Sequence, residues 1–485
     1  MSEEFKPEET LDPSDWNQVR AIGHRMMDDV MNDLSSIRSR PVWKRMPPSV
    51  KETFDSPVPR SPQALESVYD EFRKNIEPYA AGNRHPSFWG WVIGSGTPTG
   101  VLGDMLASAM NTNAAGFEQS SAYVEAQVIN WFKSLFGFPD DATGILVSSG
   151  SAANLTSLTV ARDAILPEAR DDGLFAARTR AFVYASDEVH NSVDKAVGIL
   201  GLGRSSLRRI PTKADFTIDI DALRTAIAQD KSNGDKPICV VGTAGTVATG
   251  AIDDLSAIAD ICRDNGMWFH VDGAFGAIAA LSDALRPRLK GMERADSIAF
   301  DLHKWLYVNF DAGCVLVRRP DAQLKSFSIP ASYLSTLKGG IATGPYRFGE
   351  MGIDLSRGFR ALKAWMSFKT YGFDQYARMV DQNVAQASYL AGLVNTEPEL
   401  ELVAPASLNI VCFRYVKDGM SSVELDELNE HILVTLQEDG LAVPSGVRIR
   451  GEFALRVANV NHRSRREDFD ALVKNTLRIG REVSR

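Results

Sequence analysis

The most informative part of the chain is Asp296-Ser-Ile-Ala-Phe-Asp-Leu-His-Lys304-Trp-Leu-Tyr-Val-Asn-Phe-Asp-Ala-Gly-Cys-Val-Leu-Val317. Residues 297–300 and 314–317 are apolar runs typical of buried strands. Lys304 lies between them, beside a histidine and a tryptophan, so we expect its side chain to be partly desolvated. Burial disfavours the ammonium form, and a neutral amine is a nucleophile that can form a Schiff base with an aldehyde.

A carboxylate in a second run complements this lysine. Residues 267–271 form another apolar run, and it ends at Asp272. A Schiff-base lysine and an aspartate partner for a pyridinium nitrogen are together the protein signature of pyridoxal-phosphate chemistry. Taken singly, a lysine is usually a solvated charge and an aspartate after a strand is usually a turn residue or helix cap. The prediction therefore depends on further residues in a compatible order.

Strands and helices alternate through the middle of the chain, which predicts an α/β fold with a mostly parallel sheet and helices on both faces. Ligands of such sheets bind beyond the carboxyl ends of the strands. The candidate site residues Gly150, His190, Thr243, Thr246, Asp272 and Lys304 all follow predicted strands. The predicted strands are 145–147, 181–185, 238–241 and 267–271, and the predicted helices are 152–164, 190–200 and 254–264.

The segment Ser148-Ser-Gly150-Ser151 joins a predicted strand to a predicted helix. Free backbone N–H groups and the helix macrodipole favour an anion there, and Gly150 allows close approach of the backbone. Ser151 offers a hydroxyl donor. The alternative is a plain helix cap with small residues.

Four more polar residues are candidates with plain alternatives. His190 could stack on a flat cofactor ring, or be an exposed first-turn histidine. Thr243 and Thr246 could bond a phenolic oxygen or carboxylate, or only shape a turn. His303 would point away from Lys304 in an extended chain, toward a phosphate or substrate, or only pack against the neighbouring tryptophan.

Composition narrows the class of protein. The chain has 485 residues, 44% hydrophobic and 24% charged, with a net charge of −9 and no basic block. These values are those of a globular protein of two or three domains, and they argue against a nucleic-acid partner. The acidic start is not a secretory signal, and no run approaches the ~18 apolar residues of a membrane span. Four scattered cysteines without CxxC spacing fit reduced thiols in a cytoplasmic protein.

Three segments differ in pattern. Residues 1–84 carry apolar faces at helical spacing over 23–37 and 61–76 but little core, which predicts a helical dimerisation segment. We expect residues 85–375 to form the large cofactor-binding domain. Residues 376–485, with strands at 409–415 and 454–457 and helices at 423–438 and 466–479, predict a smaller α+β domain.

The chain resembles the group II pyridoxal-phosphate decarboxylases, which include aromatic amino acid, glutamate and histidine decarboxylases. That family has the aspartate-aminotransferase-like fold (fold type I), and the match looks colinear from about residue 85 to 371. The motifs that carry it are His85-Pro-Ser-Phe-Trp-Gly-Trp91, Gly100-Val-Leu-Gly-Asp-Met-Leu106, Ser149-Gly-Ser-Ala-Ala-Asn154, His190-Asn-Ser192, His270-Val-Asp-Gly-Ala274 and His303-Lys-Trp305.

The resemblance implies a role for each matching position. Lys304 would carry pyridoxal 5'-phosphate, with Asp272 on the ring nitrogen. Tyr333 falls where the family has a tyrosine on a mobile loop, and would be a catalytic proton donor. The resemblance further implies an obligate homodimer with its active site at the interface. Ala274 would pack under the ring, His190 would stack on its face, and Gly150, Ser151 and His303 would surround the phosphate.

Three departures from the family pattern affect the site. Val92 stands where aromatic amino acid decarboxylases have phenylalanine, Val247 where some members have threonine, and Asp301 where they have asparagine near the phosphate. Trp89 and Trp91 still offer aromatic walls for a substrate pocket.

The leading hypothesis is an L-amino-acid α-decarboxylase that forms an amine and CO2. An aromatic substrate is favoured over an acidic one, because no clear carboxylate clamp lies near residues 89–94. A pyridoxal-phosphate aldehyde synthase, aminotransferase or other lyase are alternatives on the same fold. A dehydrogenase would need a nucleotide fingerprint, and Gly201-Leu-Gly-Arg-Ser-Ser206 lacks its last glycine. A non-catalytic protein that retains the fold is a third class.

Overall fold

The computed structural model describes residues 9–329 and 339–485 and contains two β-sheets. The large sheet has seven strands in the order β1-β7-β6-β5-β4-β2-β3. Its strands are β1 (Thr143–Val147), β2 (Ala181–Ser186), β3 (Leu207–Ile210), β4 (Lys236–Thr243), β5 (Trp268–Asp272), β6 (Ser297–Asp301) and β7 (Gly313–Val317).

Strand β7 is the exception to the predicted parallel arrangement. It runs antiparallel to both β6 and β1, whereas β6, β5, β4, β2 and β3 pair in parallel. Residues 302–312 join β6 to β7 without a helix, and a parallel neighbour would need a longer crossover. This short connection contains Lys304, so it holds the lysine at the edge where β6 ends.

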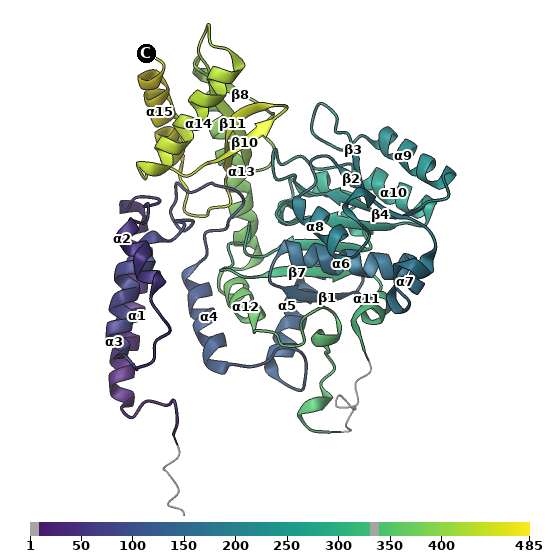
Figure 1. The fold of residues 1–485 in the computed structure, drawn as a ribbon, viewed down its shortest axis with the longest axis horizontal. Coiled ribbons are helices and arrows are strands. Elements are labelled where there is room, and N and C mark those ends of the chain that lie inside the picture. Colours follow the sequence, from purple (N-terminus) through teal and green to yellow (C-terminus); the bar gives the residue numbers. More distant parts are fainter. Residues whose placement is uncertain (1–8, 330–338) are drawn as a thin grey trace, which may run out of the picture.

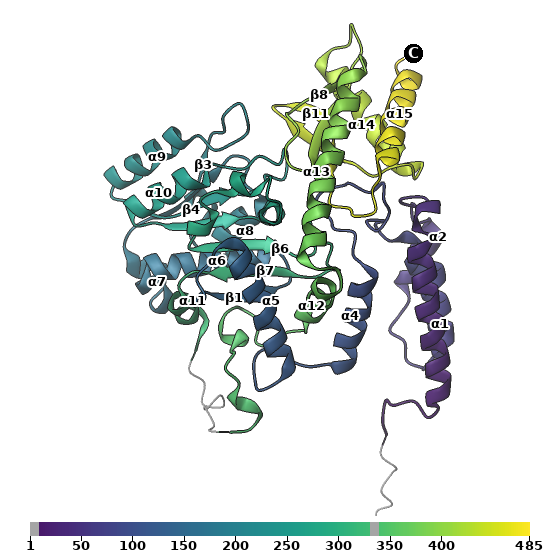
Figure 2. The same ribbon diagram turned by 180° about the vertical axis from the view of Figure 1, so that it is seen from behind.

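Helices cover both faces of the large sheet, as the opposite views in Figures 1 and 2 show. Helix α6 crosses β4, β5, β6 and β7, and α10 packs on β4 and β5. The helices of this region are α4 (Pro98–Met110), α5 (Ser120–Phe136), α6 (Gly150–Ile165), α7 (Pro167–Asp171), α8 (Asn191–Ile199), α9 (Ile220–Ser232), α10 (Leu255–Asn265), α11 (Pro320–Phe327) and α12 (Arg360–Tyr371).

The small sheet is antiparallel, in the order β10-β11-β9-β8, and α13, α14 and α15 pack against it. Helix α13 joins the two regions: Tyr376 and Val380 belong to the large core, while Leu390 and Val394 belong to the small one. A domain boundary after residue 375 therefore remains a proposal that divides one helix. The elements are β8 (Leu400–Leu402), β9 (Ile410–Tyr415), β10 (Ser445–Ile449), β11 (Glu452–Ala458), α13 (Phe373–Thr396), α14 (Ser422–Glu438) and α15 (Arg466–Val483).

The N-terminal helices form an arm at one side of the molecule, away from the large sheet (Figure 1). They are α1 (Trp16–Ser35), α2 (Pro48–Lys51) and α3 (Leu65–Glu71), with a π-helical turn at Phe72–Ile76. Apolar side chains on this arm, including Trp16, Val68 and Ile76, are exposed. None of the described helices combines the length and hydropathy of a membrane-spanning segment.

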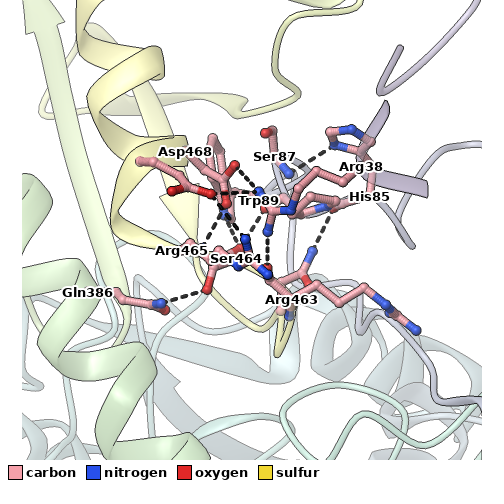
Figure 3. A network of polar contacts seen from close by, with 12 residues as sticks. Arg38, His85, Ser87, Trp89, Gln386, Arg463, Ser464, Arg465 and Asp468 are labelled. Atoms are coloured by element: carbon pink, nitrogen blue, oxygen red, sulfur yellow. Dashed lines mark hydrogen bonds and ion pairs between the residues drawn. The ribbon is translucent and has the colours of Figure 1, made fainter. Parts of the chain in front are cut away.

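Polar contacts tie the arm to the C-terminal part of the chain (Figure 3). The Arg38 guanidinium donates to the Asp468 carboxylate, with 2.7 Å between Nη1 and Oδ1. The Trp89 indole donates to Ser464 Oγ at 3.0 Å, and Gln386 Nε2 donates to the Ser464 carbonyl at 2.7 Å. Trp89 is thus enclosed between α13 and the start of α15.

A buried ion pair fixes β1 to α5. The side chains of Arg357 and Glu125 are 2% and 0% exposed, and their charged groups lie 2.5 Å apart. Arg357 also donates to the carbonyls of Leu146 (2.6 Å) and Ala114 (2.7 Å), while Glu125 accepts from Leu146 N–H (2.9 Å). The pair therefore supplies hydrogen-bond partners to the Leu146 N–H and carbonyl of β1, the strand that leads into α6.

We predict that Arg357→Met lowers the free energy of unfolding by about 3–5 kcal/mol, because it leaves the Glu125 charge buried without its partner. The measurement is urea unfolding followed by circular dichroism. The matched control is Arg478→Met, which removes an exposed pair with Glu482 on α15 and should scarcely move the midpoint. Equal midpoints for the two variants would contradict the role of the buried pair.

Candidate functional site

The carboxyl ends of β4, β5 and β6 bring the predicted site residues together. Thr243 is the register partner of Asp272, which in turn pairs with Ala299 in β6. Asp301 ends β6 and Lys304 follows in the turn. The edge expected from the strand pattern is therefore the edge at which these residues lie.

Lys304 lies beside a buried carboxylate. Its Nζ is 2.9 Å from Asp301 Oδ2, and the lysine side chain is 20% exposed, against 2% for Asp301. His303 is also near, with Nε2 3.9 Å from the same oxygen. The expectation that an extended chain would turn His303 away from Lys304 is wrong, because the chain turns here and both side chains approach Asp301.

His303 is held by its own surroundings. Its Nδ1 lies 2.8 Å from the Ala312 carbonyl, and its ring packs on Phe310 with 4.2 Å between centroids. Burial lowers the pKa of His303, while Asp301 raises it to a smaller extent. The aromatic neighbour is Phe310, whereas the plain alternative had named Trp305.

Glycine at position 150 is required by close packing. A Cβ there would lie 2.7 Å from Asp301 Oδ2 and 3.4 Å from the Ala274 Cβ. Gly313 is equally constrained, since its Cβ would lie 2.8 Å from Asp301 Oδ1. The first turn of α6, Ala274 and Asp301 thus form one cradle, with Ser151 exposed at its rim.

Asp272 is 4% exposed and is held by two donors. Ala274 N–H donates to Oδ1 at 3.1 Å, and Asn154 Nδ2 donates to Oδ2 at 2.9 Å. Asn154 appeared in the sequence only as part of a motif with no assigned role. Nothing local marks it, because its partner is far along the chain.

His190 caps α8 and is half-buried, so it is not the exposed first-turn residue of the plain alternative. Its Nδ1 accepts from Ser192 N–H at 3.2 Å and lies 2.7 Å from Ser192 Oγ. Burial lowers the pKa of His190, Asp272 opposes this, and Lys304 adds to it. Burial therefore favours the neutral imidazole.

The two threonines differ in what their hydroxyls do. Thr246 is fully buried, and its Oγ1 lies 3.0 Å from Thr249 Oγ1 and accepts from Ala251 N–H at 3.1 Å. Its hydroxyl closes a turn, as the plain alternative held. Thr243 Oγ1 is buried and has no hydrogen-bond partner among residues 9–329 and 339–485, so Thr243 is the better candidate for a ligand contact.

The predicted aromatic walls are not equivalent. Trp89 is 1% exposed and stacks on Phe469 at 4.8 Å, so it cannot line an open pocket. Trp91 is 56% exposed and has a positive φ of 53°. Its segment runs over the lysine turn: a Cβ at Gly94 would lie 2.1 Å from the His303 carbonyl oxygen. Val92 is buried in the large core.

Arg456 is a buried cation that the sequence did not reveal. Its guanidinium donates to the carbonyls of Ala248 (3.1 Å) and Trp91 (3.0 Å), and burial lowers its pKa to about 10. Within the described parts of the chain, Nη2 has no hydrogen-bond partner. It lies on β11, so only folding brings it to Trp91. Tyr333 lies outside the described residues.

Comparison with known proteins identifies the chemistry. The fold, with Lys304 and Asp272 at the same edge of the large sheet, is that of a pyridoxal-phosphate enzyme of the aspartate-aminotransferase-like fold, fold type I. The chain belongs to the pyridoxal-dependent decarboxylases, because the model of the pyridoxal-dependent decarboxylase conserved domain matches residues 47–416. It is a pyridoxal-phosphate-dependent amino acid decarboxylase, a lyase.

Three relatives illustrate the match. An aromatic-L-amino-acid decarboxylase of Bacillus atrophaeus is 34% identical over 96% of both chains. Tryptophan decarboxylase 2 of Oryza sativa subsp. japonica is 30% identical over 93% of this chain and 92% of its own length. The crystal structure of Oryza sativa TDC with PLP and tryptamine has a TM-score of 0.90 and 27% identity, and covers 98% of this chain and 100% of its own.

The residues present fit pyridoxal phosphate. Lys304 supplies an amine, Asp272 a buried carboxylate, and the first turn of α6 free N–H groups beside a glycine. The buried hydroxyl of Thr243 adds a donor that otherwise has no partner in the described chain.

We predict that Gly150→Ala weakens pyridoxal-phosphate binding by roughly tenfold or more, since the added Cβ must displace Asp301 or the first turn of α6. The measurement is a spectrophotometric titration of cofactor-free enzyme. Gly198→Ala on α8 is the control, because its Cβ meets nothing nearer than 3.8 Å. Unchanged affinity in the Gly150 variant would show that the cradle does not receive the cofactor.

Proposed function

We propose that this decarboxylase acts on an aromatic L-amino acid. The observation that supports this most directly is Trp91, an exposed indole on the segment that crosses the Lys304 turn. Phe310, packed against His303 with the two rings tilted by 36°, is also half-exposed nearby. The printed names of the aromatic amino acid and tryptophan decarboxylase relatives point the same way.

The positions of the site residues support a role for each of them. Lys304 binds the cofactor and Asp272, a buried acceptor, holds the proton on its ring nitrogen. His190 would face the cofactor ring, and Arg456, whose Nη2 has no partner in the described residues, would receive the substrate carboxylate. Bound pyridoxal phosphate supplies an aldehyde for the amine and a ring that takes up the electron pair when CO2 leaves. Gly150, Ser151, Ala274, His303 and Thr243 complete the proposed cofactor site, and Thr246, whose hydroxyl closes the adjoining turn, would only shape the backbone beside Thr243.

Tyr333 is proposed as the residue that returns a proton to Cα. That step distinguishes decarboxylation to an amine from aldehyde synthesis on the same fold, because Cα left unprotonated is open to oxygen. The proposal rests on the sequence.

The test of the substrate is a panel of all twenty amino acids with CO2 and amine measured together. We expect kcat/KM for aromatic substrates to exceed that for glutamate and aspartate by roughly 10–200-fold. Lys304→Ala should lose turnover and the cofactor that borohydride fixes to wild-type enzyme, while keeping its circular dichroism. A preference for acidic substrates would refute the aromatic proposal and leave the decarboxylase class intact.

Tyr333→Phe keeps the ring and removes the proton. We predict amine formation slower by about 10²–10⁴, unchanged cofactor binding, and new aldehyde, ammonia and peroxide in the presence of oxygen. Assaying amine, aldehyde and peroxide in one reaction decides the matter: wild-type amine yield without aldehyde removes Tyr333 from the mechanism.

We further propose a cytoplasmic homodimer with the active site at its interface. The arm exposes Trp16, Val68 and Ile76, and α4 exposes Leu106 and Met110 beside it, apolar surface that a second copy would cover. The cysteines are buried and unpaired, as a reducing compartment allows.

We predict that light scattering gives the mass of a dimer, and that Met110→Glu shifts it toward monomer and lowers activity in parallel, since a charge would be placed in the interface. The control is Ile199→Glu, which changes an exposed apolar residue of α8 outside this surface. An active wild-type monomer would refute the proposal.

A further inference from the structure

A continuous chain of buried hydrogen bonds connects two residues of the candidate site, Asp272 and His190. It runs from Trp268 through Ser297 and His270 to Asn154, where it branches to Asp272 and to Ser192, which contacts His190. The distances are 2.8 Å (Trp268 Nε1 to Ser297 Oγ), 2.9 Å (Ser297 Oγ to His270 Nδ1), 2.9 Å (His270 Nε2 to Asn154 Oδ1), 2.9 Å (Asn154 Nδ2 to Asp272 Oδ2 and to Ser192 Oγ) and 2.7 Å (Ser192 Oγ to His190 Nδ1).

The chemistry of its ends fixes the direction of every bond. The Trp268 indole N–H donates to Ser297 Oγ, and the Ser297 proton goes to His270 Nδ1, because the acceptor Asn154 Oδ1 requires the proton of the neutral ring to be on Nε2. His270 then carries its proton on Nε2 and donates to the Asn154 carbonyl. Burial lowers the pKa of His270 to about 4, so the ring is neutral and one nitrogen must accept.

The other end imposes the same direction. Both Asp272 oxygens accept, Oδ1 from Ala274 N–H and Oδ2 from Asn154, so the amide nitrogen of Asn154, not its oxygen, faces Asp272. The second amide hydrogen goes to Ser192 Oγ, which leaves the Ser192 proton for His190 Nδ1. Ser192 N–H also donates to that nitrogen. The free proton of His190 is therefore on Nε2.

We propose that Asn154 is a positioning residue of the decarboxylation, which sets the Asp272 carboxylate and the Nε2–H tautomer of His190 together. The inference rests on the roles proposed for Asp272 and His190. Asn154 suits this junction because its planar amide can donate two hydrogen bonds and accept one. A hydroxyl has one proton and could donate to only one of the two branches.

The junction is rigid because its members are buried. Asn154, His270, Ser297 and Ser192 are each at most 2% exposed, so water cannot replace a lost partner. Breaking one bond leaves a donor or acceptor unsatisfied, and the remaining members must reorient. A change at Ser297, remote from the reacting atoms, should therefore be felt at His190.

The hydrogen-bond chain has two branches at Asn154, one to Asp272 and one to His190, and variants in them should differ in effect. Asn154→Ala should lower both cofactor affinity and kcat by roughly 10–100-fold, as loss of a residue that orients a ligand contact does. Ser192→Ala should lower kcat about two- to tenfold and leave cofactor affinity unchanged, because it affects only the branch to His190. Ser157→Ala is the matched control: Ser157 is buried on α6 like Asn154, and its Oγ has no partner within the described ranges.

The deciding experiment is nitrogen NMR of cofactor-free enzyme with 15N-labelled histidine rings, with the His190 signal assigned from His190→Gln. We expect wild type to carry the proton on Nε2 at neutral pH, and Ser297→Ala and Asn154→Ala to move that signal toward a mixture of tautomers. Ser157→Ala should leave it in place.

A wild-type His190 protonated on Nδ1 would overturn the proposal without any variant. So would Ser297→Ala and Asn154→Ala spectra identical to that of Ser157→Ala. Because the spectrum needs neither cofactor nor substrate, a failure here is distinguishable from a failure of the proposed function, which turnover measures.

Discussion

The hydrogen bond between Asn154 and the Asp272 carboxylate joins the two elements on which the site depends. Asn154 lies on α6, which crosses the middle of the large sheet, and Asp272 ends β5. A carboxylate buried at the end of a strand is costly unless donors satisfy it, and the amide supplies one of them. The first turn of α6 is thereby held beside Ala274 and Asp301, where Gly150 leaves no room for a side chain.

The second constraint is the short connection between β6 and β7. It reverses the chain within residues 302–312 and so makes β7 antiparallel. Lys304 is thereby confined to the same edge as Asp272, with its Nζ 2.9 Å from Asp301 Oδ2. Position at this edge, together with burial on neighbouring strands, allows ordinary residue types to act on a cofactor, as expected for a pyridoxal-dependent decarboxylase.

The segment that contains Trp89 and Trp91, together with the small region, borders the proposed site. Arg456, on β11, reaches the carbonyl of Trp91, and Trp91 belongs to the segment that crosses the lysine turn. The same segment is anchored by Trp89, which is enclosed between α13 and α15. The surface proposed for substrate thus depends on contacts among three parts of the chain that are far apart in sequence.

Most of the elements of the large sheet, and the residues expected to carry the chemistry, could be predicted from the amino-acid sequence alone. Apolar runs followed by small or polar residues placed β4, β5 and β6 within a few residues of their bounds, because strand and helix periodicity is local. Strand β3 was missed, since Leu207–Ile210 is short and carries two arginines. Lys304 and Asp272 were recognisable because each ends or follows an apolar run. The contacts that each side chain makes became visible only in the folded chain. There the Thr246 hydroxyl closes a turn, Trp89 is buried, His303 points toward Asp301, and Asn154 donates to two acceptors. Trp89 and Asn154 contact partners tens to hundreds of residues away, which no local pattern of residues encodes. Thr246 and His303 contact near neighbours, and their outcome depends on the exact turn that the folded chain makes there.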